Sequence, residues 1–341
     1  MSESETLAAR RTSVRKPPAT IYDVAKLTGV SPSTVSRALN KPGRLKAATE
    51  QRIRTAADEL GYRINPMARS LPTGKTGTIA LLVSDITNPV YFDLVRGAER
   101  VASERGITLV FAESQESAAR EKSTAERLQT SVDGLLLVAS RLDDDGIRDL
   151  SAIKPLVIAN RLVPEVPAVV PDVSAGIAAA LDDLTERGHR RIAFLAGPEA
   201  SWMNRVRWGT LFDQAVKRNM SIVEINSVAP TREGGAEAVA RVLAADVTAV
   251  VAYNDLLALG LLRACRDRGV QVPERLSIIG FDDIFGADLP TPALSTIKSP
   301  LAAIGGEATL RLLDEIDGVD SEDHPLLSTS YISRDSVADL R

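Results

Sequence analysis

The sequence predicts an α/β fold in which a small helical segment precedes two lobes of parallel β-sheet. Short apolar runs alternate with helical patterns from residue 78 onwards, which is typical of parallel sheets covered by helices on both faces. Residues 20–60 hold three short helical patterns and no strand pattern. Roughly 265 residues follow position 76, more than one hydrophobic core comfortably holds, so we expect two lobes there.

The three N-terminal helices have clear start and stop signals. Thr20 is a good N-cap, with Asp23 three residues later as in a capping box, and Gly29 ends the first helix. Ser31 and Pro32 begin the second, where proline loses no hydrogen bond. The third is predicted from about 46 to 60. The first two helices are joined by a three-residue turn that contains Gly29 and Val30. So short a turn indicates a helix-turn-helix, whose second helix enters the DNA major groove.

Charge is divided unevenly along the chain. Residues 1–76 carry 14 basic and 6 acidic side chains, a net charge of +8, whereas the remainder has a net charge of -12. A basic segment joined to an acidic body favours a nucleic-acid-binding module, and Arg37 could contact a guanine with two hydrogen bonds. A solvated tail is the alternative, and residues 1–19 are themselves predicted to be a disordered basic arm. The helix-turn-helix domain is assigned to 20–64.

Residues 65–76 are predicted to form a short hinge helix and linker. The stretch NPMARSL could make one and a half helical turns after Pro66, leaving Leu71 exposed between basic residues. Proteins that bind the minor groove insert such residues between base steps. On these residues alone, a linker leucine that touches the following domain is the favoured alternative.

The core is assigned to 77–341, with lobe one about 77–173 and 298–320 and lobe two about 174–297 and 321–341. The predicted strands are 78–84, 107–113, 134–140, 155–160, 191–197, 247–254 and 276–283. Helices are predicted at about 89–105, 119–131, 174–188, 204–219, 233–245, 255–268 and 300–317.

Polar side chains follow several of these strands, where parallel sheets bind ligands. Asp85, Asn160 with Arg161, Asn254 and Asp282 stand at such ends, and the aromatic pair Tyr91 and Phe92 follows the first strand. Hydrogen-bonding groups beside aromatic rings suit a small polar ligand with a flat face, such as a sugar or a nucleobase.

Composition argues against several protein classes. No apolar run reaches the roughly 18 residues of a membrane span, and the N-terminus has no apolar signal stretch, which favours a cytoplasmic protein. One cysteine and two histidines leave little for a disulfide framework or a metal site. No nucleophile–base pattern indicates an enzyme, and we expect no cofactor.

Seven stretches resemble the lactose/galactose repressor family of transcriptional regulators: TIYDVAKLTGVSPSTVSRALN, ELGYRINPMARSL, TGTIALLVSDITNPVYFDLVRGAE, ERGHRRIAFLAGP, AYNDLLALG, VPERLSIIGFDDI and TPALSTI. The resemblance spans 20 to about 336. It implies a dimeric repressor with a core like periplasmic sugar-binding proteins. The headpiece would bind one half of a palindromic operator, the hinge leucine would enter the minor groove, and an effector in the core cleft would change DNA affinity.

Carried onto this chain, the resemblance implies two sets of contact residues. The DNA contacts would be Thr20, Ser31, Pro32, Ser33, Thr34, Ser36, Arg37, Asn40, Asn65, Ala68, Arg69 and Leu71. The effector contacts would be Asp85, Tyr91, Phe92, Asn160, Arg161, Trp202, Arg207, Asn254 and Asp282. The family's arginine clamp could be Arg205 or Arg207, because the spacing departs from the usual pattern, and we favour Arg207. Trp202 is either a stacking wall or loop packing.

Three functions compete at this point. A repressor controlled by an effector explains the basic headpiece, whereas a ligand-binding transport or signalling protein would share the core alone, and an enzyme has no supporting side chains. The effector is expected to be a sugar or sugar derivative, with a nucleoside or purine corepressor as the alternative. No leucine heptad follows the last strand, so we predict a homodimer rather than a tetramer.

Overall fold

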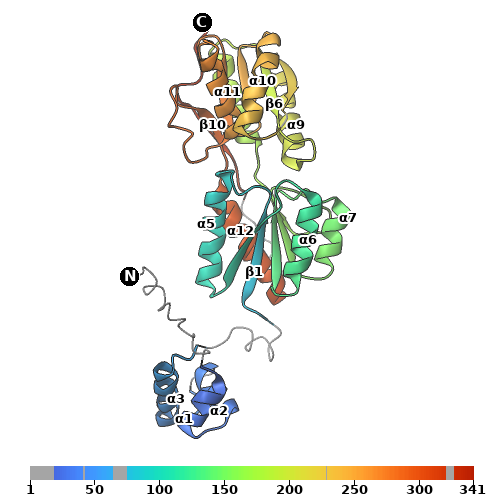
Figure 1. Ribbon diagram of the computed structural model, residues 1–341. Coiled ribbons are helices and arrows are strands. Elements are labelled where there is room, and N and C mark those ends of the chain that lie inside the picture. The colour runs from blue at the N-terminus through green and yellow to red at the C-terminus, as the bar shows by residue number, and fades with distance from the viewer. Residues whose placement is uncertain (1–18, 41–42, 64–74, 228, 320–325) are drawn as a thin grey trace, which may run out of the picture. The chain divides into compact units, whose positions relative to one another are not determined.

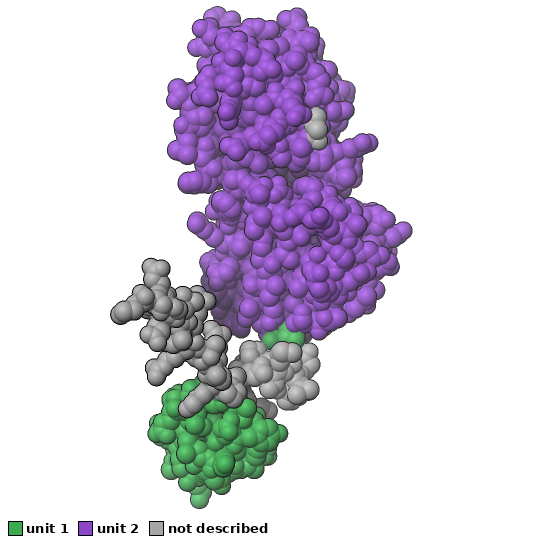
Figure 2. Space-filling view, in the orientation of Figure 1, with its two compact units in different colours: residues 1–76 green, residues 77–341 purple. Residues whose placement is uncertain are grey.

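The computed structural model describes residues 19–40, 43–63, 75–227, 229–319 and 326–341. The chain divides into two compact units, residues 1–76 and 77–341 (Figure 2). The predicted basic arm and the hinge positions Asn65, Ala68, Arg69 and Leu71 lie outside the described residues.

The first unit contains three helices, α1 (Ile21–Thr28), α2 (Pro32–Asn40) and α3 (Ala47–Glu59). They enclose a small core of seven buried side chains: Val24, Ala25, Val35, Ala38, Ile53, Ala56 and Ala57. Gly29 has a φ of 68°, the left-handed backbone that ends α1 and that glycine adopts without strain. The predicted helix-turn-helix is therefore confirmed, together with its stop signal.

Lobe one of the second unit is built on a five-stranded parallel sheet in the order β2-β1-β3-β4-β5 (Figure 1). Its strands are β1 (Thr78–Val83), β2 (Thr108–Glu113), β3 (Gly134–Val138), β4 (Leu156–Ala159) and β5 (Ala168–Val169). Alternate residues of β1 enter two different cores, Leu81 on the side of α5 (Val90–Glu104) and Leu82 on the side of α6 (Ala118–Gln129) and α7 (Asp144–Ser151). Burial on both faces explains why these strands read as continuous apolar runs.

Lobe two holds a six-stranded sheet in the order β11-β10-β9-β8-β6-β7. Its strands are β6 (Arg191–Ala196), β7 (Ser221–Asn226), β8 (Ala249–Ala252), β9 (Ser277–Asp282), β10 (Ser295–Lys298) and β11 (Ser330–Ile332), of which only β11 runs antiparallel to its neighbour. One face packs on α8 (Ser174–Glu186) and α9 (Trp202–Lys217), the other on α10 (Arg232–Ala244) and α11 (Asp255–Asp267).

Helix α12 (Leu301–Asp317) follows the strands of lobe two in the sequence but packs in lobe one. Its Ile304, Ala308 and Leu312 join the core formed by α5 and the lobe-one sheet, and Figure 1 shows it beside α5. Contact between the two helices is close, because a Cβ atom on Gly97 of α5 would lie 1.9 Å from the carbonyl oxygen of Ala302. The lobes therefore share the chain and do not follow one another in sequence.

All seven predicted strands and all seven predicted core helices are present, with ends shifted by a few residues. The predicted α/β fold class, with its helical headpiece, is confirmed. The acidic run 143–145 predicts the start of a helix but not the whole of α7, and the strands β5, β7, β10 and β11 were missed. These strands are short or lie at sheet edges, so they carry no continuous apolar run.

Candidate functional site

The second helix of the headpiece begins at a network of hydroxyl groups. The Ser31 hydroxyl accepts a hydrogen bond from the Thr34 backbone N–H at 3.2 Å, and its oxygen lies 2.9 Å from Ser33 Oγ and 2.8 Å from Thr34 Oγ1. Pro32 occupies the first helical position, as expected. Ser33 and Arg37 are exposed, while Val35 and Ala38 are buried beneath them. The exposed face of α2 is thus free to contact another molecule.

Helix α1 contributes a second polar end. The Thr20 backbone N–H donates to the Asp23 carboxylate at 2.8 Å, and the Thr20 hydroxyl donates to the same oxygen at 2.7 Å, which completes the predicted cap. These bonds lower the pKa of Asp23. Tyr22 is 71% exposed on the first turn of α1. Such an exposed aromatic ring is a candidate contact that the sequence reasoning missed, although its position beside the cap could have indicated it.

In the core, the centre of the candidate effector site is a buried ion pair in lobe two. Arg207 Nη2 donates to Asp282 Oδ1 at 2.8 Å, and the two side chains are 7% and 6% exposed. The Arg207 guanidinium lies 3.7 Å from the ring centroid of Phe281 and 5.0 Å from that of Tyr253, and it also donates to the Tyr253 carbonyl oxygen. Its Nε has no hydrogen-bond partner. A buried, incompletely satisfied guanidinium is suited to receive a polar ligand.

Asp282 is held in an unusual backbone conformation. Its φ is 104°, and its carboxylate also accepts a hydrogen bond from Ser299 Oγ at 3.0 Å. Beneath it, the buried Asp255 carboxyl accepts from the Ile284 backbone N–H at 2.8 Å and from Thr296 Oγ1 at 2.7 Å. Burial raises the pKa of Asp255 to about 8. Backbone strain supported by buried polar contacts is common at binding sites.

The two arginines considered for the clamp have different surroundings. Arg205 is exposed and donates only to the carbonyl oxygen of Glu199, at 3.4 Å, whereas Arg207 is buried against Asp282. This arrangement favours Arg207. Trp202, the first residue of α9, is partly buried against the apolar core of lobe two, in keeping with the packing alternative.

The predicted aromatic pair lies at the start of α5 in lobe one. Tyr91 lies on the first turn of α5, is 7% exposed, and its hydroxyl is 2.6 Å from Ser84 Oγ. Burial raises the pKa of Tyr91 far above its ordinary value. The adjacent Phe92 is half exposed. Asp85 accepts hydrogen bonds from the backbone and hydroxyl of Thr87, at 2.8 and 2.7 Å, so it also caps the turn after β1.

Two predicted effector residues are engaged within their own lobes. The buried Arg161 donates to the carbonyl oxygens of Ser140 and Leu142 and to Asp144 Oδ1, which leaves only its Nε without a partner. Asn254 caps α11, accepting from the Leu257 N–H at 2.9 Å and donating to the Pro230 carbonyl at 3.0 Å. The side chains of Arg161 and Asn254 therefore form hydrogen bonds mainly with backbone groups of their own lobe. Asn160 stands before Arg161 with a left-handed φ of 60°.

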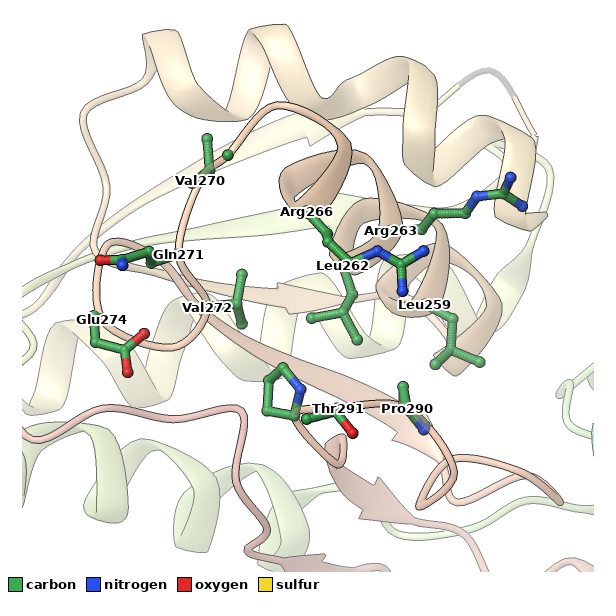
Figure 3. Close-up of a pocket in the computed structure, with 12 residues that line it drawn as sticks. Leu259, Leu262, Arg263, Arg266, Val270, Gln271, Val272, Glu274, Pro290 and Thr291 are labelled. Atoms are coloured by element: carbon green, nitrogen blue, oxygen red, sulfur yellow. The ribbon is translucent and has the colours of Figure 1, made fainter.

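Other cavities of lobe two lie away from these residues. A groove of about 360 Å³ runs along α11 and the loops at 269–274 and 290–292, with Leu259, Leu262 and Val272 among its apolar side chains (Figure 3). None of the predicted effector contacts lines it. Within the described part of the chain, no helix is long and apolar enough to cross a membrane.

Comparison with known proteins gives two family matches. Residues 20–65 match the model for bacterial regulatory proteins of the lacI family, and residues 181–337 match the periplasmic binding protein-like domain. The HTH-type transcriptional repressor CytR of Escherichia coli is 37% identical over 309 residues, covering 88% of this chain and 90% of the relative. The HTH-type transcriptional repressor PurR of Vibrio atlanticus is 32% identical and covers 89% and 94%.

Solved structures agree with these relatives. The Lac repressor dimer bound to operator and the anti-inducer ONPF matches with a TM-score of 0.85 and 25% identity, covering 94% of this chain and 100% of that one. The complex of the transcriptional regulator CelR with cellobiose matches at 0.68 and 31%, covering 93% and 99%. These relatives are transcriptional regulators and not enzymes. The chain accordingly belongs to the lacI family of bacterial regulatory proteins.

Proposed function

We propose that this chain is a cytoplasmic repressor that binds a palindromic operator as a homodimer and whose operator affinity is set by a small polar effector bound between the core lobes. The observation that carries the proposal is the capped, exposed face of α2 on a basic headpiece. The family membership and the regulator relatives support it.

In the headpiece, the exposed Ser33 and Arg37 would contact base edges, and the capped start of α2 would lie near phosphate. Ser36, Pro32, Thr34 and Asn40 belong to the same helix, and Thr20 begins α1. The hinge residues Asn65, Ala68, Arg69 and Leu71 complete the proposed DNA contacts.

In the core, the proposed effector contacts centre on Arg207 and Asp282 of lobe two and on Tyr91 and Phe92 of lobe one. Guanidinium and carboxylate groups pair with the hydroxyl groups of a sugar, and aromatic rings pack on its flat faces. The structure of CelR with cellobiose, a sugar complex of a similar protein, supports a sugar or sugar derivative as the first choice. A nucleoside is the other effector to test.

The second copy of the chain would pack on the apolar surface around the groove on α11. Phe285 and Leu289 are 82% and 74% exposed, and Leu289 also lines a second hollow beside the groove with Leu259 and Pro290. Exposed apolar surface of this kind marks association sites. The Lac repressor match is itself a dimer.

The test of the DNA assignment compares Arg37→Ala with Arg52→Ala. Both remove one positive charge from an exposed headpiece position, but Arg52 lies on α3. The operator is first obtained by selecting sheared genomic DNA on the immobilised protein, with and without cell metabolites. We expect Arg37→Ala to lose about 1–3 kcal/mol of operator binding and its preference at one base pair.

Arg52→Ala should keep the preference for operator over random DNA. Equal losses on operator and random DNA for Arg37→Ala would contradict the base contact. Selection that yields no shared palindrome, with or without metabolites, would contradict the repressor function itself.

A further inference from the structure

An ion pair with a buried arginine and a partly exposed glutamate lies in lobe one, outside the residues discussed so far. Arg141 follows β3, its side chain is 6% exposed, and its Nε donates to Glu116 Oε2 at 2.6 Å. Its Nη1 donates to the Ala139 carbonyl oxygen at 2.7 Å. Glu116 follows β2 and is 31% exposed. The pair therefore stands at the carboxyl ends of two parallel strands, the edge where such sheets bind ligands.

The backbone around this pair is held in strained conformations. Gln115, Glu116 and Ala139 have φ values of 52°, 58° and 52°, in the left-handed region that residues with side chains rarely adopt. Glu121 of α6, 3% exposed, accepts a hydrogen bond from the Arg141 backbone N–H at 2.8 Å. Burial raises the pKa of Glu121. Strained backbone beside a buried, hydrogen-bonded carboxyl group is typical of binding sites.

The pair still has hydrogen-bonding capacity. Among the described residues, neither Arg141 Nη2 nor Glu116 Oε1 has a hydrogen-bond partner. Within the described part of the chain, no polar atom of Arg141 is both unpaired and sealed from solvent. A donor and an acceptor of the same ion pair can thus each form a further hydrogen bond from the solvent side.

Tyr253 of lobe two lies near Arg141. Although burial disfavours the charged guanidinium, the nearby Tyr253 and Glu116 raise the pKa of Arg141. Tyr253 follows β8, and its hydroxyl lies 3.0 Å from Ser201 Oγ. Tyr253 also lies under the guanidinium of Arg207. Tyr253 is therefore a neighbour of both arginines, Arg141 and Arg207.

We propose that Arg141 and Glu116 form a specificity-determining subsite for the effector, which binds a neutral group that offers an acceptor and a donor on adjacent atoms. The proposal rests on the proposed function and names the chemistry of one end of its effector. The guanidinium donates to the acceptor, and the carboxylate takes the hydrogen of the donor. Because the pair is neutral as a whole, it favours an uncharged group.

Two sources supply this chemistry, a vicinal diol of a sugar ring and the amide edge of a nucleobase. Matched probes separate them. D-Glucose with 2-deoxy-D-glucose, and D-ribose with 2-deoxy-D-ribose, differ in one hydroxyl of a diol. Uracil and 1,3-dimethyluracil differ in the N–H groups of the amide edge. Binding of each probe to the full-length protein is measured by calorimetry.

The variants are Arg141→Lys, which keeps the charge but loses the planar fork, and Glu116→Gln, which keeps the size but loses the charge. Arg148→Lys is the matched control, because Arg148 pairs with Asp145 at 2.8 Å on the exposed face of α7 in the same lobe. Thermal unfolding of each variant monitors folding.

We expect both subsite variants to bind the preferred probe about 10- to 100-fold more weakly. They should also lose most of the discrimination between the members of its matched pair, whereas Arg148→Lys behaves as wild type. Equal weakening of both members, with discrimination kept, would show a structural role and overturn the subsite, as would unchanged binding. If wild type binds none of the probes, the subsite chemistry is overturned, while the operator selection described above decides the proposed function separately.

Discussion

Removing one member of the Arg207–Asp282 pair tests the centre of the effector site. The pair is joined at 2.8 Å with side chains only 7% and 6% exposed, so the loss of either charge leaves the other buried without its partner. Breaking a buried pair in this way costs about 3–5 kcal/mol. We expect Arg207→Met and Asp282→Leu each to lower the free energy of unfolding of lobe two by that amount.

The double variant separates the pair from its surroundings. With both charges gone, no buried ion is left unpaired, so the double variant should be more stable than the sum of the two single effects predicts, by about 1–3 kcal/mol. Arg148 and Asp145 provide the control, because they are also joined at 2.8 Å but are 37% and 90% exposed. Arg148→Met should cost no more than about 1 kcal/mol.

Urea unfolding followed by tryptophan fluorescence suits this comparison, since both tryptophans of the chain, Trp202 and Trp208, lie on α9 of lobe two. The burial argument would be refuted if Arg207→Met cost no more than Arg148→Met, or if the two single effects simply added. Either result would mean that water reaches the pair.

Further outcomes follow from the packing and from one histidine. Gly97→Ala should lower Tm, at a cost of about 1–3 kcal/mol, because its Cβ would meet the Ala302 carbonyl oxygen at 1.9 Å. Gly209→Ala, in open space on α9, should raise Tm instead, and a fall in both would contradict the steric reason. Burial lowers the pKa of His189 from 6.5, so the unfolded chain binds a proton that the folded protein does not. Stability should therefore fall as the pH drops below about 6.5, and less so in His189→Gln, as urea unfolding at pH 7.5 and 5 can measure; the same loss in both proteins would exclude His189 as the cause.

The sequence was sufficient to predict elements whose burial leaves a periodic pattern. Strands buried on both faces, such as 78–83, read as apolar runs, and capped helices announce their ends through residues such as Thr20 and Gly29. Strand β7 lies at a sheet edge and its Val223 and Glu224 are exposed, so no apolar run marks it. In β10, Ser295 and Thr296 are fully buried, and their hydroxyl groups bond to the Arg334 backbone N–H and to Asp255 of α11, which periodicity cannot predict.

Site residues depend on contacts between distant segments, and here the sequence was less informative. It indicated that polar side chains follow the strands, but not which way they turn. Arg161 turns to the carbonyl oxygens of its own lobe, while Arg141, which follows β3 in the same manner, was overlooked. The same rule that selected Arg161, a polar side chain directly after a buried strand, also applies to Arg141. Arg207 could be preferred over Arg205 from the resemblance, but its burial against Phe281 required the folded structure.

The position of α12 has a consequence for the synthesis of the protein. The ribosome releases the sheet of lobe one through Val169, but α12, which covers one of its faces together with α5, ends only at Asp317, 148 residues later. At the usual rates of translation this interval lasts roughly 7 to 30 s. Throughout it, Leu136 and Val157 lack their final cover, while lobe two emerges and begins to collapse. Nascent chains stalled before residue 301 should therefore expose apolar surface and bind chaperones, whereas chains released beyond 317 should not.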